Sequence, residues 1–202
     1  MAEAGRVVTG SAKGTRLLAP GPGTRPLPDR LKQALFASLE AALGTDWPVP
    51  FLDLYAGSGA GGIEALSRGA PRAVFVERDP GAARTIAENL RRARLSDLAQ
   101  IIRRDVFAVL TRGAERHGGP FGAVLVDPPY ADRQSLSATL DQLGDPGLGW
   151  VREGAIVVAK HAWREDPPVR AGRLILERRR HFGETGLAYY RPDTSREASV
   201  RS

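Results

Sequence analysis

One stretch of the chain reads Phe51-Leu52-Asp53-Leu54-Tyr55-Ala56-Gly57-Ser58-Gly59-Ala60-Gly61-Gly62, which is a short apolar run followed by a glycine-rich turn. Residues 63–67 continue with apolar side chains at helical spacing. Glycines tolerate positive φ, and they let backbone N–H groups come close to a ligand at the start of a helix. The stretch therefore predicts a buried strand, a nucleotide-binding turn and a helix.

The glycine spacing alone leaves the type of nucleotide cofactor open. Gly57, Gly59 and Gly62 fit the fingerprint of dinucleotide-binding turns, and no Lys-Ser or Lys-Thr pair follows them, as a P-loop would require. A carboxylate at the strand end, Asp53, repels a pyrophosphate but attracts the cationic methionine portion of S-adenosylmethionine. We therefore predict S-adenosylmethionine as the cofactor. Its expected ligands here are Asp53 and the turn residues Tyr55, Ala56, Gly57, Ser58 and Gly59.

Two further strand candidates also lead into acidic residues. Residues 73–76 form an apolar run that ends in Glu77, which can accept hydrogen bonds from both ribose hydroxyls. Residues 99–103 lead into Asp105, which can accept from an adenine amine while Val106 or Phe107 flanks the ring. An N-cap of the following helix is an equally good interpretation of Asp105. Glu77 indicates a nucleoside without distinguishing one cofactor from another.

The tetrapeptide Asp127-Pro128-Pro129-Tyr130 follows the apolar run 121–126 and indicates the chemistry. Prolines cannot donate ladder hydrogen bonds, so the strand ends here and presents Asp127 where open α/β sheets bind ligands. The carboxylate and the Pro128 carbonyl can accept both N–H bonds of a planar amine and localise its lone pair, while Tyr130 stacks on the base. We predict methyl transfer to an exocyclic amine; a turn that merely ends the strand is the alternative.

Strands and helices alternate along most of the chain, which predicts a parallel α/β sheet. The expected helices are 27–43, 60–68, 80–93, 106–112 and 135–143, and the expected strands are 50–54, 73–77, 99–103, 121–126, 154–159, 174–180 and 187–190. We expect a Rossmann-like class I S-adenosylmethionine-dependent methyltransferase fold. The seven expected strands resemble the sheet of that fold, which is mostly parallel and has an antiparallel last strand. Turn signals between two short strand-like pieces near the amino end predict a small β-hairpin, which together with the first helix would extend the sheet.

The chain resembles the RsmD family, which methylates a guanine N2 in 16S ribosomal RNA. The shared motifs are Asp53 to Gly59, Glu64 to Ala70, Glu77, Asp127 to Tyr130, Arg6 to Gly10, Gly14 to Leu18, Thr24 to Phe36 and Phe182 to Thr185. The resemblance covers roughly residues 5–191. The glycine turn and the Asp-Pro-Pro-Tyr sequence are common to many amine methyltransferases. The amino-terminal motifs are therefore the ones that distinguish the RsmD family from the others.

This resemblance implies guanine-N2 methylation of 16S rRNA, either as naked RNA or in an assembling small ribosomal subunit. The chain departs from the usual family pattern at four places: Thr9, Leu27-Pro28, Gly61-Gly62 and Lys160-His161. At the last of these, a basic pair stands where the family usually has a glutamate. These departures do not affect the predicted methyl-transfer chemistry. They leave open which nucleotide is modified.

The charge balance favours a polyanionic partner. There are 29 Lys and Arg against 23 Asp and Glu, which gives a net charge of +6, although a GC-rich genome or a thermophile also produces an arginine-rich chain. Five basic residues gather in an amino-terminal segment rich in Gly and Pro: Arg6, Lys13, Arg16, Arg25 and Arg30. We expect this segment to contact RNA phosphates. Arg178 to Arg180 are either a second contact or a solvated strand face.

Length and composition indicate one folded core. We divide the 202 residues into a basic N-terminal extension (1–44), a methyltransferase domain (45–191) and a flexible tail (192–202). The chain has no Cys, and its three His show no metal-ligand spacing, so we expect no disulfide and no metal. It has no apolar run of the ~20 residues that span a bilayer and no signal-peptide core. We expect a cytoplasmic monomer without membrane contact.

Three other functions stay open at this point. An adenine-N6 methyltransferase acting on DNA or another RNA would use the same carboxylate and prolines. A nicotinamide-dependent oxidoreductase fits the Gly57, Gly59 and Gly62 spacing but gives the Asp-Pro-Pro-Tyr sequence no role. A noncatalytic RNA-binding or assembly factor would have no need for an intact Asp53, Glu77 and Asp127.

Overall fold

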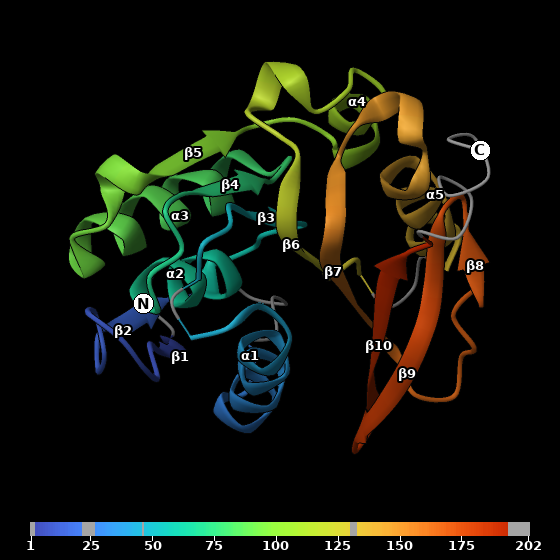
Figure 1. Cartoon of the computed structure of the whole chain (residues 1–202). Helices are drawn as coiled ribbons and strands as arrows, with labels where there is room; N and C mark the ends of the chain where they lie inside the picture. The colour runs from blue at the N-terminus through green and yellow to red at the C-terminus, as the bar shows by residue number, and fades with distance from the viewer. Residues whose placement is uncertain (1–2, 22–26, 46, 130–132, 194–202) are drawn as a thin grey trace.

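A computed structural model describes residues 3–21, 27–45, 47–129 and 133–193. This part of the chain contains a small two-stranded sheet near the amino end and a large eight-stranded sheet (Figure 1). The small sheet consists of β1 (Glu3–Arg6) and β2 (Arg16–Leu18). The large sheet consists of β3 (Phe51–Leu54), β4 (Ala73–Val76), β5 (Ala99–Ile102), β6 (Phe121–Val126), β7 (Val151–Ala162), β8 (Arg170–Ala171), β9 (Leu174–Phe182) and β10 (Thr185–Pro192).

Helices connect the strands where the alternating pattern predicts them. The α-helices are α1 (Asp29–Leu43), α2 (Ala60–Ser67), α3 (Pro80–Ala93), α4 (Val106–Leu110) and α5 (Arg133–Gly144), and the 3-10 helices are η1 (Ser96–Leu98), η2 (Glu115–His117) and η3 (Pro146–Leu148). Within the described ranges, none of these helices has the length and apolar character that a membrane span needs.

The order of strands in the large sheet is β5-β4-β3-β6-β7-β10-β9-β8. The first five are parallel, and β10 runs antiparallel to both β7 and β9. The chain moves outward from β3 to β5 and then returns to β6, so the direction of winding reverses between β3 and β6. In open α/β sheets, ligands bind at the carboxyl ends of the strands beside such a reversal. The predicted Rossmann-like methyltransferase fold is confirmed.

Two details of the predicted sheet are wrong. The sheet has eight strands and not seven, because Arg170 and Ala171 form the short edge strand β8 against Leu174 and Ile175 of β9. A two-residue strand has no periodic pattern, so only its pairing with β9 defines it. Strand β10 also continues through Pro192, so the sheet includes the first residue of the predicted tail.

Apolar side chains bury both faces of the central strands β3, β4 and β6 of the large sheet. On one face, α1, α2 and α3 pack against residues such as Phe51, Phe75 and Val158. On the other face, α4 and α5 pack against residues such as Leu52 and Val124. Figure 1 shows α1 and α2 on one side of the sheet and α5 on the other. Strands buried on both faces explain the nearly continuous apolar runs in the sequence.

Helix α2 lies unusually close to the sheet because two glycines lie on its inner side. A Cβ at Gly61 would come within 2.6 Å of Leu125 Cδ2, and a Cβ at Gly62 within 2.3 Å of Phe75 Cε1. A side chain at either position would therefore push the helix off the sheet. This close packing gives the Gly61-Gly62 departure a structural reason.

The amino-terminal extension packs into the same core as the large sheet. Ala4, Val7 and Leu17 of the hairpin region are buried in one apolar cluster with Phe36 of α1 and Phe51 of β3. The boundary between the extension and the methyltransferase domain stays a prediction. The contacts nevertheless hold the hairpin and α1 in a fixed position relative to the sheet.

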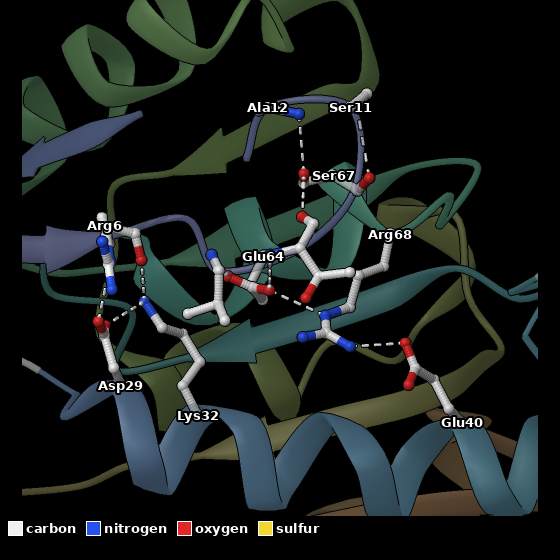
Figure 2. Close-up of polar contacts among 11 residues, drawn as sticks. Arg6, Ser11, Ala12, Asp29, Lys32, Glu40, Glu64, Ser67 and Arg68 are labelled. Atoms are coloured by element: carbon white, nitrogen blue, oxygen red, sulfur yellow. Dashed lines mark hydrogen bonds and ion pairs between the residues drawn. The ribbon is translucent and has the colours of Figure 1, made fainter. Parts of the chain in front are cut away.

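A buried carboxylate on α2, Glu64, anchors the loop of this hairpin (Figure 2). Its two oxygens accept hydrogen bonds from the backbone N–H groups of Val8 (2.7 Å) and Thr9 (3.0 Å). Arg68 Nε also donates to Glu64 at 2.8 Å, and Arg68 Nη1 pairs with Glu40 of α1 at 2.6 Å. The carboxylate thus joins the hairpin and α1 to the helix that follows the glycine turn.

Ser67, one turn further along α2, holds the same loop. Its hydroxyl accepts from Ala12 N–H at 2.9 Å and donates to the Thr9 carbonyl at 2.6 Å, while its own carbonyl accepts from Ser11 N–H at 2.8 Å (Figure 2). Lys32 of α1 supports the other side of the hairpin, where its ammonium donates to the Arg6 carbonyl. Burial lowers the pKa of Lys32.

A second buried polar side chain, Asn89 of α3, joins the hairpin to the glycine turn. Its amide pairs with the backbone of Leu18 in β2, accepting from the N–H at 2.8 Å and donating to the carbonyl at 3.0 Å. The same amide nitrogen donates to the Ser58 carbonyl at 2.9 Å. Asn89 therefore fixes the distance between β2 and the turn.

Removing the Glu64 carboxylate should destabilise the protein strongly. Glu64→Ala leaves the part-buried backbone N–H groups of Val8 and Thr9 without their acceptor and breaks the buried ion pair with Arg68, so we expect the free energy of unfolding to fall by about 3–5 kcal/mol. Urea denaturation measures the loss. Glu88→Ala is the matched control, because Glu88 pairs with Arg91 on the exposed side of α3 and should change stability little. Equal losses in the two variants would contradict the anchoring role.

Candidate functional site

A cavity of about 930 Å³ opens at the carboxyl ends of β3, β4, β6 and β7. Its volume lies in the range of sites for nucleotide-sized ligands. The residues that line it include most of the predicted site residues: Asp53, Tyr55, Ala56, Gly57, Ser58, Glu77, Asp105, Val106, Asp127, Pro128 and Pro129. Pro20, Gly21 and Leu27 of the amino-terminal extension also line it. The topology therefore brings separate sequence motifs to one place.

The glycine turn forms one wall of the cavity and needs its glycines. Gly57 and Gly59 have φ values of 54° and 77°, in the left-handed region that favours glycine, and Tyr55 before them has φ 60°. Gly59 is the N-cap of α2, and a Cβ there would come within 3.2 Å of Ile86 Cγ2. Gly59 is absent from the cavity lining; it shapes the turn from behind.

Asp53 lies at the base of the cavity with its carboxylate almost fully buried. Its Oδ2 accepts a hydrogen bond from the Gly62 N–H at 2.7 Å. The pKa of Asp53 is raised to about 8, mainly by burial; the Gly62 hydrogen bond opposes this rise, and the negative charges of Asp127 and Glu77 contribute to it. A cationic group in the cavity would relieve this repulsion and lower the pKa. The position thus suits a cationic ligand better than an anionic one.

Glu77 and Asp105 in the cavity wall each accept hydrogen bonds from backbone N–H groups. Glu77 accepts from the Gly57 N–H (2.9 Å) and from the Asp79 N–H (2.8 Å), so it supports the glycine turn from the end of β4. Asp105 is the N-cap of α4 and accepts from the Ala108 N–H at 3.1 Å. The N-cap interpretation of Asp105 is confirmed. Its contact with adenine, and that of Glu77 with ribose, stay predictions.

Asp127 lies in the wall of the cavity at the end of β6, next to Pro128 and Pro129. Both carboxylate oxygens accept from the ammonium group of Lys160, at 2.7 Å and 2.9 Å. Burial raises the pKa of Asp127, whereas the charge and hydrogen bonds of Lys160 lower it. The fourth residue of the motif, Tyr130, lies outside the described residues.

Lys160 is the site residue that the sequence motifs did not identify. It extends from β7, its side chain is only 8% exposed, and it lines the cavity. The sequence does contain a sign of this role, because Lys160 interrupts the apolar run of β7. That strand pairs with β6, which ends just before Asp127. His161 next to it faces the other side of the sheet, where its ring lies over Gly186. Only the lysine of the basic pair belongs to the site.

Tyr55 contributes to the cavity mainly through its ring. Its hydroxyl hydrogen-bonds to Thr139 of α5 at 2.8 Å, so the phenol joins the turn to the opposite helix. Gln134 and Ser135 at the start of α5 complete this wall. Phe107 also lines the cavity and is 48% exposed, which is high for a large apolar side chain. An exposed ring beside Asp105 fits the predicted contact with a planar base.

The amino-terminal basic residues lie outside the cavity lining. Arg6 pairs with Asp29 at 3.2 Å and Arg16 pairs with Glu3 at 2.9 Å, and all four side chains are largely or partly exposed. Exposed pairs of this kind contribute little stability and can exchange partners with a phosphate. Lys13 and Arg30 are exposed. Arg25 lies outside the described residues.

Known proteins resemble this chain over almost its whole length. The family model described as Conserved hypothetical protein 95 matches residues 5–191. The chain is 37% identical over 191 residues to the Bacillus subtilis (strain 168) protein named "Putative rRNA methyltransferase YlbH", covering 92% of this chain and 98% of that protein. It is 28% identical to Ribosomal RNA small subunit methyltransferase D of Escherichia coli (strain K12), and the match covers 96% of this chain and 93% of that protein.

A solved structure agrees with these sequence relatives. The Escherichia coli protein yhhF, described as a putative methyltransferase, has a TM-score of 0.76 and 29% identity, with 93% of this chain and 97% of that chain covered. The described part of the present chain contains no group of three or more His, Asp or Glu arranged to hold a metal ion. The chain thus belongs to the Conserved hypothetical protein 95 family, which is the RsmD family that its motifs resemble.

Proposed function

We propose that this protein transfers a methyl group from S-adenosylmethionine to the exocyclic N2 amine of a guanine in small-subunit ribosomal RNA. One observation carries the proposal: a single cavity contains a glycine turn with the buried acid Asp53 and, facing it, the Asp127-Pro128-Pro129 segment. The first group suits a cationic nucleoside cofactor, and the second suits a planar amine. Relatives named as rRNA methyltransferases support the choice of RNA.

The residues around the turn fit S-adenosylmethionine. Asp53 would face the cationic amino-acid portion, Glu77 would accept from the ribose hydroxyls, and Asp105 with Val106 would border the adenine. The observation that favours a cation there is the buried Asp53 carboxyl at the base of the cavity, whose ionised form the charges of Asp127 and Glu77 disfavour. When bound, the cofactor supplies a methyl group on a positively charged sulfur, which needs no further activation.

The task of the protein is then to align the amine. The guanine would be extruded into the cavity beside Pro128 and Pro129, which costs less in a loop or an unfinished subunit than in a stable duplex. Asp127 and the Pro128 carbonyl would accept the two N–H bonds and direct the nitrogen lone pair at the methyl group. As the N–C bond forms, the sulfur–methyl bond would break and leave a neutral thioether, so the positive charge would pass to the amine, where the Asp127 carboxylate would stabilise it. The methylated amine would then lose a proton to water.

Lys160 gives this arrangement a feature of its own. Its ammonium balances the Asp127 charge while leaving each oxygen a further lone pair for the amine. It also holds the carboxylate in one orientation.

The monomeric state of the protein and its cytoplasmic location stay predictions.

Label transfer tests the proposed function directly. The protein is incubated with S-adenosylmethionine carrying a tritiated methyl group and with small ribosomal subunits that lack the modification, and the labelled nucleoside is identified by mass analysis. We expect label in N2-methylguanosine of the small-subunit RNA. If the label appears in N6-methyladenosine, the target base is adenine and not guanine. If no label appears in RNA, the proposal is overturned.

Replacing Asp127 should separate chemistry from cofactor binding. In Asp127→Asn we expect the single-turnover rate to fall by about 10²–10³-fold, the size seen when one transition-state contact is lost, while the dissociation constant for S-adenosylmethionine changes little. The double variant Asp127→Asn with Lys160→Met also removes the lysine charge that Asp127 no longer balances, and it should stay equally slow. The exposed Asp141→Asn is the control. An equal loss of cofactor affinity in the Asp127 variants would count against the assignment.

Lys160 should control the pH dependence of the reaction. Asp127 must be ionised to accept from the amine, and Lys160 lowers its pKa, so Lys160→Met should shift the acidic limb of the rate profile to higher pH. The loss of rate is then larger at pH 6 than at pH 9. Asp53, whose charge interacts with that of Asp127, is the same in both proteins. Single-turnover rates across this range measure the shift, and Lys160→Arg should restore the profile; a pH-independent loss would contradict the role.

A further inference from the structure

The three consecutive arginines of β9 are divided between the two faces of the sheet. Arg180 is in register with Leu187 of β10, and Leu187 is in register with Lys160 of β7. Residues in register across a sheet point to the same face, so Arg180 lies on the face of Lys160, two strand spacings or about 10 Å away. Arg178, two residues earlier, lies on this face as well. Arg179 lies on the other.

Arg178 and Arg180 are exposed, and neighbouring groups hold both side chains along the surface. The Arg178 guanidinium lies 4.5 Å from the centre of the Tyr189 ring, and that of Arg180 lies 5.5 Å from the centre of the Phe182 ring. Arg180 Nη1 also donates to Ser38 Oγ of α1 at 3.3 Å. The stacking orients the two cations without neutralising them.

Arg179 on the opposite face has a structural role. It pairs with Asp166 and donates to the carbonyls of Trp163 and Glu165, and its guanidinium lies 4.7 Å from the centre of the Trp163 ring. Glu177, the acidic neighbour of Arg178 in sequence, pairs with Arg191 at 3.5 Å. The surface beside the cavity therefore presents the positive charges of Arg178 and Arg180.

The position of this surface matches the path of a long substrate. Figure 1 shows the β9–β10 hairpin extending past the parallel strands at the same end of the molecule as β1, β2 and α1. In this view, the β1–β2 hairpin and the β9–β10 hairpin lie on two sides of α1. A polynucleotide with one base in the cavity must leave it in two directions along its backbone.

We propose that Arg178 and Arg180 form a second phosphate-binding surface, which holds the RNA strand on the β9 side of the cavity. The inference rests on the proposed function and adds a specific contact to it. Arginines that bind phosphates position a nucleic acid without reading its sequence. The surface would thus fix where the target base enters, independently of the residues that select it.

The salt dependence of RNA binding tests the proposal. The affinity for a 16S rRNA transcript is measured in a series of KCl concentrations, for the wild-type protein and for Arg178→Gln with Arg180→Gln. Each lost phosphate contact lowers the slope of log affinity against log salt by about 0.7 for a single strand, so we expect a decrease of about 1.4 and roughly tenfold weaker binding at 0.1 M salt. The dissociation constant for S-adenosylmethionine should not change.

Matched variants separate a phosphate contact from a general effect of charge or folding. Arg116→Gln with Arg152→Gln removes the same charge from exposed positions before and at the start of strands, far from the carboxyl edge, and should keep the wild-type slope. Arg178→Lys with Arg180→Lys keeps the charge and should also keep it. Arg178→Gln alone, as the milder change, should lower the slope by about half as much as the pair.

Three results would overturn the inference. One is an unchanged slope in the β9 variants while wild-type protein binds and methylates the RNA, which leaves the proposed function in place. Another is that the control variant Arg116→Gln with Arg152→Gln lowers the salt-dependence slope as much as the β9 double variant does. The third is a wild-type protein that neither binds nor methylates the transcript or small subunits, which removes the proposed function together with this surface.

Discussion

The hydrogen bond from the Gly62 N–H to the buried Asp53 carboxylate is the contact on which the site depends. It requires α2 to lie almost against the sheet, and the absence of side chains at Gly61 and Gly62 makes that possible. The same close approach places the glycine turn over the end of β3, where Asp53, Glu77 and Asp127 line one cavity. The repulsion among them is tolerable because Lys160 balances Asp127 and because a cationic ligand fits beside Asp53.

Helix α2 also connects the two halves of the proposed activity. Its first turn carries the backbone that faces the cofactor, and its last two turns carry Glu64 and Ser67, which bind the hairpin loop. Asn89 makes a second connection from β2 to the Ser58 carbonyl. If the hairpin binds RNA as we propose, these contacts would hold the bound RNA at a fixed position relative to the glycine turn. Protein–RNA contacts far from the chemistry can then determine where the target base enters.

The sequence predicted the fold and most of the cavity because the informative signals are local. Apolar runs, the glycine turn and a double proline each specify a strand end, and parallel strands bring such ends together. Lys160 and Glu64 could not be assigned in this way, since each acts through partners more than 30 residues away in the chain. The short strand β8 exists only through its pairing with β9. The choice of guanine over adenine rests on the family resemblance, because Asp127 and the prolines serve either amine.

Proton release on cofactor binding tests the central claim, that a bound cation stabilises the ionised form of the buried Asp53 at the base of the cavity. Because burial raises the pKa of Asp53 to about 8 in the free protein, this group is mostly protonated at pH 7.5, and a bound cation should drive its proton off. Calorimetric titration in buffers of different ionisation enthalpy counts the protons. We predict that S-adenosylmethionine binds with net release of a substantial fraction of one proton and that NAD binds far more weakly. Identical binding enthalpies in all buffers, or tighter binding of NAD, would contradict the account.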